Sequence, residues 1–513
     1  MNSNKKPALR LRTTDHPLVY EVNTRLLLNE LSAKKGERVT LSDLPEEIID
    51  RWEALGFDAV WLMGVWTTGQ LGCEIAATVP GLQEEYKRVL PDFTMEDVLG
   101  SPYAVKSYTV SPSLGGPDAL RSFRARLAKK GLGLILDYVG NHTARDHRWV
   151  SSNPELYING EEGEENTLSD KYFLASTSEG MKTLAYGRDP LFPGWIDTAQ
   201  LNYFHPDLRR KMVKCLEKIA EQCDGVRCDM AMLMLNSVFE RTWGERAHAG
   251  GLATPETEFW AEAIKAVREL SPDFMFIAEA YWDMGWDLQN LGFDHTYDKR
   301  FYDRILHEGA TSVIEHLAAD PGFQKKSVRF IENHDERRAA DVLPSPLWHS
   351  AAATVMATIP GMILFHDGQM EGRTVKVPVQ LGRRTAEVPS SILEGFYRTL
   401  LECIRSDVFR TGTWSLLRPR AAWNDNQTWQ SFFSFWWDGG ERGIRFVVVN
   451  YSPHNGQCYI PIPINPVPSG TLEFRDLMGS AVYYREASGV VAKGMFFDLT
   501  AYGVHIFDVR RTA

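Results

Sequence analysis

The feature that most limits the fold is a regular alternation along the chain between short apolar runs and longer helix-like segments. The runs are rich in β-branched and aromatic residues, and the segments between them, such as Pro117 to Lys130 and Pro206 to Cys223, carry apolar residues at helical spacing. This alternation predicts parallel strands joined by crossover helices. The runs are Leu18 to Val22, Ala59 to Met63, Leu132 to Val139, Gly225 to Asp229, Phe274 to Glu279, Gly292 to Tyr297, Val328 to Glu332 and Met362 to Phe365.

Eight such runs favour an α/β fold that closes on itself, the (β/α)8 TIM barrel, over an open sheet. The weakest run is Gly292 to Tyr297, and the count of eight depends on it. The chain has 513 residues, whereas a barrel of this kind typically needs about 250, so the sequence has room for further domains.

Two segments interrupt the alternation. Residues 143–205 are rich in Asn, Glu, Gly and Ser, which predicts an irregular insertion after the third strand. Towards the C-terminus the pattern changes to closely spaced strands, such as Ile444 to Asn450, separated by turns. We therefore expect a barrel domain from residues 1–142 and 206–405, an inserted loop-rich domain at 143–205, and an antiparallel all-β domain at 406–513.

Composition and charge exclude several classes of partner. A net charge of -11 argues against nucleic acid and against an anionic membrane surface, because both require a basic face. The N-terminus lacks the apolar run of a secretory signal and no transmembrane-length apolar stretch occurs, so we expect a cytoplasmic protein. The six cysteines lack metal or disulfide spacing and predict buried free thiols. The sequence does not define the oligomeric state.

Carboxylates stand where three of the predicted strands end. They are Asp229, Glu279, and the pair Glu332 and Asp335. The strand ends of a barrel meet at one rim, and a buried carboxylate is costly there unless it is paired or used. Cleavage of a glycosidic bond needs one carboxylate beside the anomeric carbon and a second one, kept protonated, to protonate the leaving oxygen. The sequence therefore favours a glycoside-active site.

Four motifs, in order along the chain, resemble those of the α-amylase family, glycoside hydrolase family 13. They are Asp137-Tyr138-Val139-Gly140-Asn141-His142, Gly225-Val226-Arg227-Cys228-Asp229, the single acid Glu279, and Asn333-His334-Asp335. The resemblance implies that Asp229 is the nucleophile, Glu279 the general acid/base, and Asp335 a third carboxylate that grips sugar hydroxyls.

The same resemblance implies further contacts to the sugar. Arg227 would orient Asp229 and hold it ionised. His142 and His334 would donate to sugar hydroxyls, and Tyr103 would be the aromatic platform beneath the sugar ring.

Three more side chains are candidates for substrate binding. Trp66 and Trp282 follow the second and fifth strands and could pack on sugar rings. Arg338 corresponds to an arginine found in exo-acting α-glucosidases of the family, but those enzymes often carry Asp where this chain has Ala104. The choice between endo and exo action therefore stays open.

Two departures from the family pattern concern the acceptor side and a metal. Met232 and Leu233 stand where many endo-acting amylases carry Lys and His, which predicts a more apolar acceptor side. Gln200 replaces an acid that helps bind calcium in many members, and Asn141 remains as a candidate oxygen ligand. No cofactor is required by the expected chemistry, and a structural calcium ion stays open.

The resemblance implies a retaining α-glycoside hydrolase that acts on α-glucans or α-linked oligosaccharides through a covalent glycosyl-enzyme intermediate. The alternative is a glucanotransferase or transglycosylase of the same fold, because both share the three carboxylates. A role as a non-catalytic partner of a membrane transporter is disfavoured, because such relatives lose catalytic carboxylates and this chain keeps all three. Linkage and chain length of the substrate are not readable from the sequence.

Overall fold

A computed structural model describes residues 11, 14–464 and 470–512 of the chain. Eight parallel strands form a closed barrel in the order β1-β14-β13-β12-β11-β10-β5-β2, so the first and last strands are neighbours. The sequence prediction of a closed eight-stranded barrel is confirmed. The strands are β1 (Leu18–Asn23), β2 (Ala59–Met63), β5 (Gly133–Tyr138), β10 (Gly225–Cys228), β11 (Met275–Ala278), β12 (His295–Tyr297), β13 (Ser327–Arg329) and β14 (Met362–His366).

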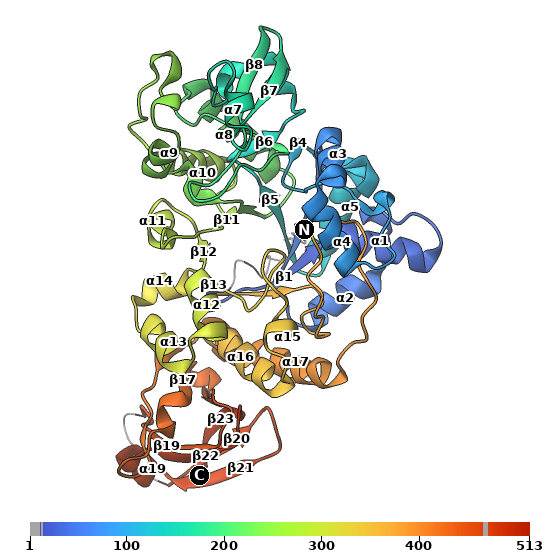
Figure 1. Cartoon of the computed structure of the whole chain (residues 1–513). Helices are drawn as coiled ribbons and strands as arrows, with labels where there is room; N and C mark the ends of the chain where they lie inside the picture. The colour runs from blue at the N-terminus through green and yellow to red at the C-terminus, as the bar shows by residue number, and fades with distance from the viewer. Residues whose placement is uncertain (1–10, 12–13, 465–469, 513) are drawn as a thin grey trace, which may run out of the picture.

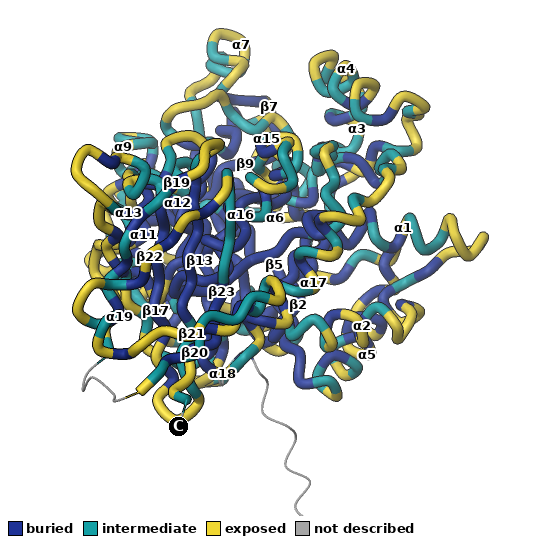
Figure 2. The backbone as a smooth tube through the Cα atoms, turned by 90° about the horizontal axis from the view of Figure 1, so that it is seen from below, coloured by how far each residue is buried: buried dark blue, intermediate teal, exposed yellow. Residues whose placement is uncertain are grey.

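Helices such as α10 cover the outside of the barrel because one of their faces is apolar. In α10 the buried residues include Phe259, Ala263 and Val267, four residues apart, while the opposite face is polar. Figure 2 shows the result, with buried strands at the centre and exposed helix surfaces around them. The main covering helices are α1 (Thr24–Lys35), α2 (Glu46–Ala54), α5 (Gly116–Lys129), α8 (Pro206–Ala220), α10 (Phe259–Leu270), α11 (Gly285–Asn290), α12 (Lys299–His307), α13 (Ala310–Leu317), α14 (Pro321–Lys325), α16 (Pro346–Thr358) and α17 (Ser391–Ile404).

One predicted strand ends earlier than expected. The run Val328 to Glu332 was expected to be extended, but β13 stops at Arg329. The reason lies in Glu332, which is fully buried, accepts a hydrogen bond from the Ala339 amide at 2.7 Å and lies 2.9 Å from Arg338. These contacts bend the chain out of the sheet, so Glu332 and the residues after it lie on a loop at the rim.

Residues 143–205 contain more regular structure than the predicted irregular insertion. An antiparallel hairpin is formed by β7 (Tyr172–Thr177) and β8 (Gly180–Ala185), and a second pair is formed by β6 (His142–Ala144) and β9 (Thr198–Gln200). The short helices α6 (Arg148–Ser152) and α7 (Glu164–Thr167) lie between them. A further projection between β2 and β5 contains β3 (Trp66–Thr68), α3 (Gln70–Thr78), α4 (Pro80–Val89) and β4 (Val105–Val110).

The C-terminal residues form two antiparallel sheets, which lie below the barrel in Figure 1, opposite the β7–β8 hairpin. The predicted antiparallel β domain is confirmed, and a short helix, α19 (Ala487–Lys493), accompanies its sheets. Trp436 is buried in the core of this module, whereas Trp437 is buried in the core that includes the barrel, and its indole donates to the Thr358 carbonyl of α16 at 2.8 Å. The strands are β15 (Thr413–Leu416), β16 (Arg420–Ala421), β17 (Phe432–Asp438), β18 (Ile444–Asn450), β19 (Gly456–Ile460), β20 (Thr471–Asp476), β21 (Val482–Glu486), β22 (Met495–Leu499) and β23 (Val504–Thr512).

The cysteines and the helices bear on two further expectations. All six cysteines are free thiols, but Cys73 and Cys215 are only half-buried, which corrects the expectation that all are buried. None of the helices described in the structure is long and apolar enough to cross a membrane.

Candidate active site

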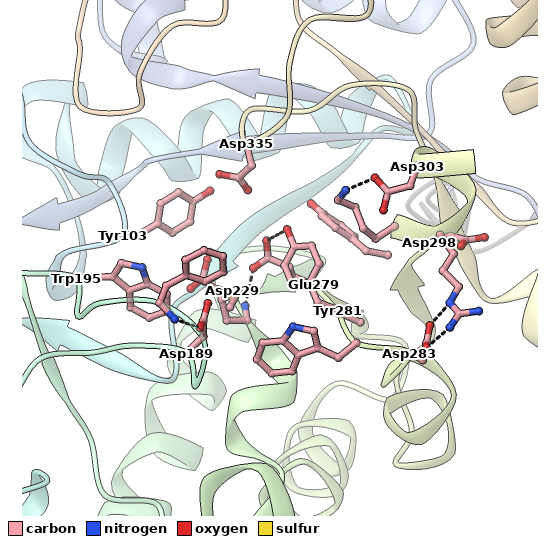
Figure 3. Close-up of a pocket in the computed structure, with 18 of the residues that line it drawn as sticks. Tyr103, Asp189, Trp195, Asp229, Glu279, Tyr281, Asp283, Asp298, Asp303 and Asp335 are labelled. Carbon is pink, nitrogen blue, oxygen red and sulfur yellow. Dashed lines mark hydrogen bonds and ion pairs between the residues drawn. The ribbon is translucent and has the colours of Figure 1, made fainter. Parts of the chain in front are cut away.

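A cavity of about 990 Å³ lies at the carboxyl ends of the barrel strands. Figure 3 shows it extending from Tyr103 and Trp195 on one side to Asp283 and Asp303 on the other, with Asp229 and Glu279 between them. The Trp195 side is supplied by the insertion, and the other side by the segments that follow β11 and β12. We call these the insertion end and the α12 end of the cavity.

Arg227 organises the carboxylates at the centre of the cavity. Its side chain is buried on β10, two residues before Asp229, so both side chains leave the same face of the strand. One guanidinium nitrogen donates to Asp229 Oδ1 at 2.6 Å, and the other lies 2.8 Å from Glu279 Oε1 and 3.7 Å from Asp335 Oδ2. A single cation thus brings together the three carboxylates that the sequence singled out.

Glu279 is held by two donors that the sequence argument missed. Its Oε2 accepts from the Met230 amide at 2.6 Å, and its Oε1 accepts from the Tyr281 hydroxyl at 3.1 Å. Met230 presents that amide from a left-handed conformation with φ of 43°, which is costly for a residue with a side chain and is typical of functional sites. Burial, followed by the charges of Asp229 and Asp335, raises the pKa of Glu279 to about 7 despite Arg227.

His334 joins Asp335 to Tyr103. Its Nε2 lies 2.6 Å from the Tyr103 hydroxyl and 3.0 Å from Asp335 Oδ2, while its Nδ1 lies 2.5 Å from Glu21 Oε1. Glu21 is fully buried at the end of β1. The charges of Asp335 and Glu21 outweigh burial and raise the pKa of His334 to about 10, and the resulting cation holds the pKa of Asp335 well below its usual range.

The remaining predicted sugar contacts divide into two groups. His142 and Trp282 line the cavity, as does Tyr103. Trp66 does not, because its ring is buried and its indole donates to the Asp137 carbonyl at 2.7 Å. Arg338 also lies outside the cavity wall, because the buried carboxylate of Glu332 holds it beneath the rim.

The expected apolar acceptor side does not arise from Met232 and Leu233. Both are buried in the core and neither lines the cavity. The sequence argument also missed several lining residues from the insertion and the late strands, because no strand-end motif marks them. They are Asp189, Phe192, Trp195, Asp197, Tyr281 and Tyr297.

The geometry around Asn141 does not fit a cation. The Gln200 Nε2 amide donates to the Asn141 backbone oxygen and to Asn141 Oδ1, each at 3.0 Å, and to the Leu201 carbonyl at 3.1 Å. An amide nitrogen thus lies where three oxygens converge, and the reversed amide would place oxygen against oxygen. Across the described residues, no group of three or more His, Cys, Asp or Glu side chains could hold a metal ion. The role of Asn141 as a calcium ligand stays a prediction, and the hydrogen bonds of the Gln200 amide do not favour it.

We expect the melting temperature of the protein to be unchanged by EDTA, because Gln200 already satisfies these oxygens. Gln200→Glu should place a carboxylate among them and create a cation site, so calcium should then raise the melting temperature of the variant by a few degrees. Differential scanning calorimetry with and without calcium checks both results. A drop in the melting temperature of the unaltered chain on adding EDTA would contradict the assignment.

Comparison with known proteins gives the fold and the family. A maltogenic α-amylase, AmyB from Thermotoga neapolitana, superposes with a TM-score of 0.66 at 19% identity, covering 97% of this chain and 99% of that one. An α-amylase from Lactobacillus plantarum gives a TM-score of 0.65 at 17% identity over 96% of this chain and 98% of that one. At these identities the likeness establishes the fold.

Curated relatives match over a smaller share of this chain. The α-1,4-glucan:maltose-1-phosphate maltosyltransferase of Rhodospirillum rubrum is 25% identical over 83% of this chain, and α-amylase MalA of Haloarcula japonica is 22% identical over 69% of it. The matches cover 56% and 44% of those two proteins, so the chain spans about half their length. The model of the α-amylase catalytic domain matches residues 47–433, well over half of the chain. By that match, the chain belongs to the α-amylase family.

Proposed function

We propose that the protein is a retaining α-glycoside hydrolase acting on α-glucans or α-linked oligosaccharides. The observation that carries the proposal is the single Arg227 guanidinium in contact with both Asp229 and Glu279. Retaining enzymes hold their two carboxyl groups about 5 to 5.5 Å apart, whereas inverting enzymes leave room for a water between them. One guanidinium shared by both carboxylates favours the closer, retaining arrangement.

In the proposed mechanism, Asp229 attacks the anomeric carbon while Glu279 gives its proton to the leaving oxygen. The bond to the leaving group breaks as the bond to Asp229 forms, and the hydrogen bond from Arg227 orients Asp229 for this step. Glu279 then removes a proton from water, which attacks the same carbon and releases the sugar from Asp229. A raised pKa suits Glu279 to this double role, because it must carry a proton before the first step and accept one in the second.

The charge of the cavity favours a neutral sugar substrate over a sugar phosphate. Among the described residues that line the cavity, Lys299 and Arg300 are the only lysine and arginine. Both form ion pairs with carboxylates. The carboxylates that line it are Asp189, Asp197, Asp229, Glu279, Asp283, Asp298, Asp303 and Asp335. An anionic substrate would be repelled by this excess, whereas sugar hydroxyls would find many acceptors.

A second candidate, transglycosylation, differs only in the group that resolves the intermediate. The aromatic side chains Trp282 and Phe323 at the α12 end of the cavity favour it, because they could hold an acceptor sugar. The test is incubation with a panel of α-linked oligosaccharides of different linkage and length, with and without excess acceptor. Reducing sugar alone supports hydrolysis, while longer or rearranged products support transfer. No product from any α-linked donor would contradict both.

We expect kcat/KM on a natural α-glycoside to fall tenfold per pH unit above about pH 7, because only protonated Glu279 can donate to the leaving oxygen. Protonation of Asp335 should reduce kcat/KM only well below the usual carboxyl range, because the pKa of Asp335 is depressed. A pH–rate profile measured under first-order conditions checks both limbs. An alkaline limb near the ordinary glutamate pKa of about 4.3 would contradict the assignment.

A further inference from the structure

Asp197 is a carboxylate in the wall of the cavity that the mechanism above does not use. It follows Trp195 in the insertion, immediately before β9, and it lies near Ala104. A β-carbon built on Gly72 would lie 3.5 Å from the Ala104 β-carbon and 3.8 Å from that of Asp197. The Asp197 side chain thus lies near the small side chain of Ala104, although the two residues are far apart in the sequence.

The Asp197 carboxylate is left available to a ligand. In the described structure no other side chain donates a hydrogen bond to it or pairs with it. Arg145 acts on Asp197 through its charge but does not pair with it, because its Nη1 donates to the Ile196 carbonyl at 3.1 Å and its guanidinium stacks 4.2 Å above the Phe173 ring. Burial raises the pKa of Asp197, which means that keeping its carboxylate charged in the cavity wall costs free energy.

Three segments meet around this end of the cavity and are attached to one another. The Asp146 carboxylate of the insertion accepts from the amide of Gln70, the first residue of α3, at 3.1 Å. The loop after β14 reaches the same place, because the Leu99 amide donates to the Gln380 carbonyl at 2.8 Å. Ser101 and Gln380 line the cavity together with Asp197. The insertion end is therefore a wall built from distant parts of the sequence.

We propose that Asp197 binds the free hydroxyls of a non-reducing terminal sugar, so that the cavity takes the ends of α-linked chains in preference to internal segments. A carboxylate only accepts hydrogen bonds, and two neighbouring hydroxyls on one sugar can donate to its two oxygens. In a 1,4-linked chain only the terminal sugar has a free 4-hydroxyl, because every internal one is part of a glycosidic bond. The inference rests on the proposed function and assigns Asp197 as its specificity residue.

The test is direct binding in the Asp229→Asn background, in which turnover is removed. Calorimetry would compare maltotriose with maltotriose whose terminal 4- and 6-hydroxyls are blocked as a benzylidene acetal. We expect the block to weaken binding roughly 10- to 100-fold, the size of a lost hydrogen bond to a charged group. Adding Asp197→Ala should weaken binding of free maltotriose by a similar factor and bring the ratio of the two dissociation constants close to one.

A matched control is Asp303→Ala, which removes a carboxylate from the α12 end of the same cavity and should leave that ratio unchanged. Asp197→Asn, which keeps the shape of the side chain, guards against a folding defect, and thermal melts compare all variants. Equal binding of both sugars before Asp197 is changed, or an unchanged ratio in Asp197→Ala, would overturn the inference alone. Failure of either sugar to bind at all would contradict the proposed function and the inference with it.

Discussion

Asp229→Asn is expected to lower kcat by about 10⁴-fold or more on every α-glycoside, because the amide cannot attack the anomeric carbon as a carboxylate does. The change is nearly isosteric, and Arg227 keeps its contact with Glu279, so the fold should persist. Steady-state rates on a natural oligosaccharide, with circular dichroism and thermal melts on the same samples, measure both effects.

The matched control for this variant is Asp303→Asn, the same chemical change at the α12 end of the cavity. It should alter kcat far less, because Asp303 pairs with Lys299 and does not touch Arg227. A folded Asp229→Asn protein with the rate of the unaltered chain would end the assignment of the nucleophile. An equal loss of kcat in both variants would mean that the rate depends on the total charge of the cavity rather than on attack by Asp229.

Glu279→Gln should separate substrates by the quality of their leaving group. On a natural glycoside the loss should be about 10² to 10⁴-fold, the usual contribution of a general acid. An activated aryl α-glycoside departs without protonation, so its first step should be slowed far less. The covalent intermediate should then accumulate, because no base is left to activate water. Rapid-quench kinetics on the two substrates measure the burst of released aryl group and the slow second step.

Azide tests the second half of the Glu279 role. It is a small anionic nucleophile that needs no base, so it should restore turnover of the activated substrate by Glu279→Gln and yield a glycosyl azide of α configuration, because it displaces Asp229 with inversion. That stereochemistry follows from attack on an intermediate in which Asp229 is β-linked. Tyr281→Phe is the control, because it removes a donor to Glu279 but leaves the base in place, and azide should not accelerate it. A β-configured azide, or no rescue, would contradict the assignment.

The parts of the fold that could be predicted are those set by local pattern. The apolar runs gave the eight strands, and the carboxylates that end them lie together because a barrel brings all its strand ends to one rim. The β13 boundary could not be predicted, because it depends on Glu332 meeting Arg338 and the Ala339 amide in three dimensions. Apolar residues alone made that segment look extended to Glu332.

The site could be predicted only where motifs mark it. Asp229, Glu279 and Asp335 stand in such motifs, whereas Asp197 lies in an insertion whose path across the barrel is set by tertiary contacts. Gln200 shows the same limit, because the three oxygens that its amide contacts are brought together only by the tertiary structure. Local pattern identifies the side chains that come with a strand, and distant packing decides the rest.

The contact between Trp437 and Thr358 belongs to a larger continuity. Phe433, Phe435 and Trp437 of β17 belong to the same apolar core as the barrel, and the covering face of α16 packs against β18. A core shared in this way couples the unfolding of the two parts, so the barrel and the six-stranded sheet should lose their structure in one cooperative transition. Cutting the chain between the two parts would expose aromatic side chains of each fragment to water, which favours aggregation of both fragments.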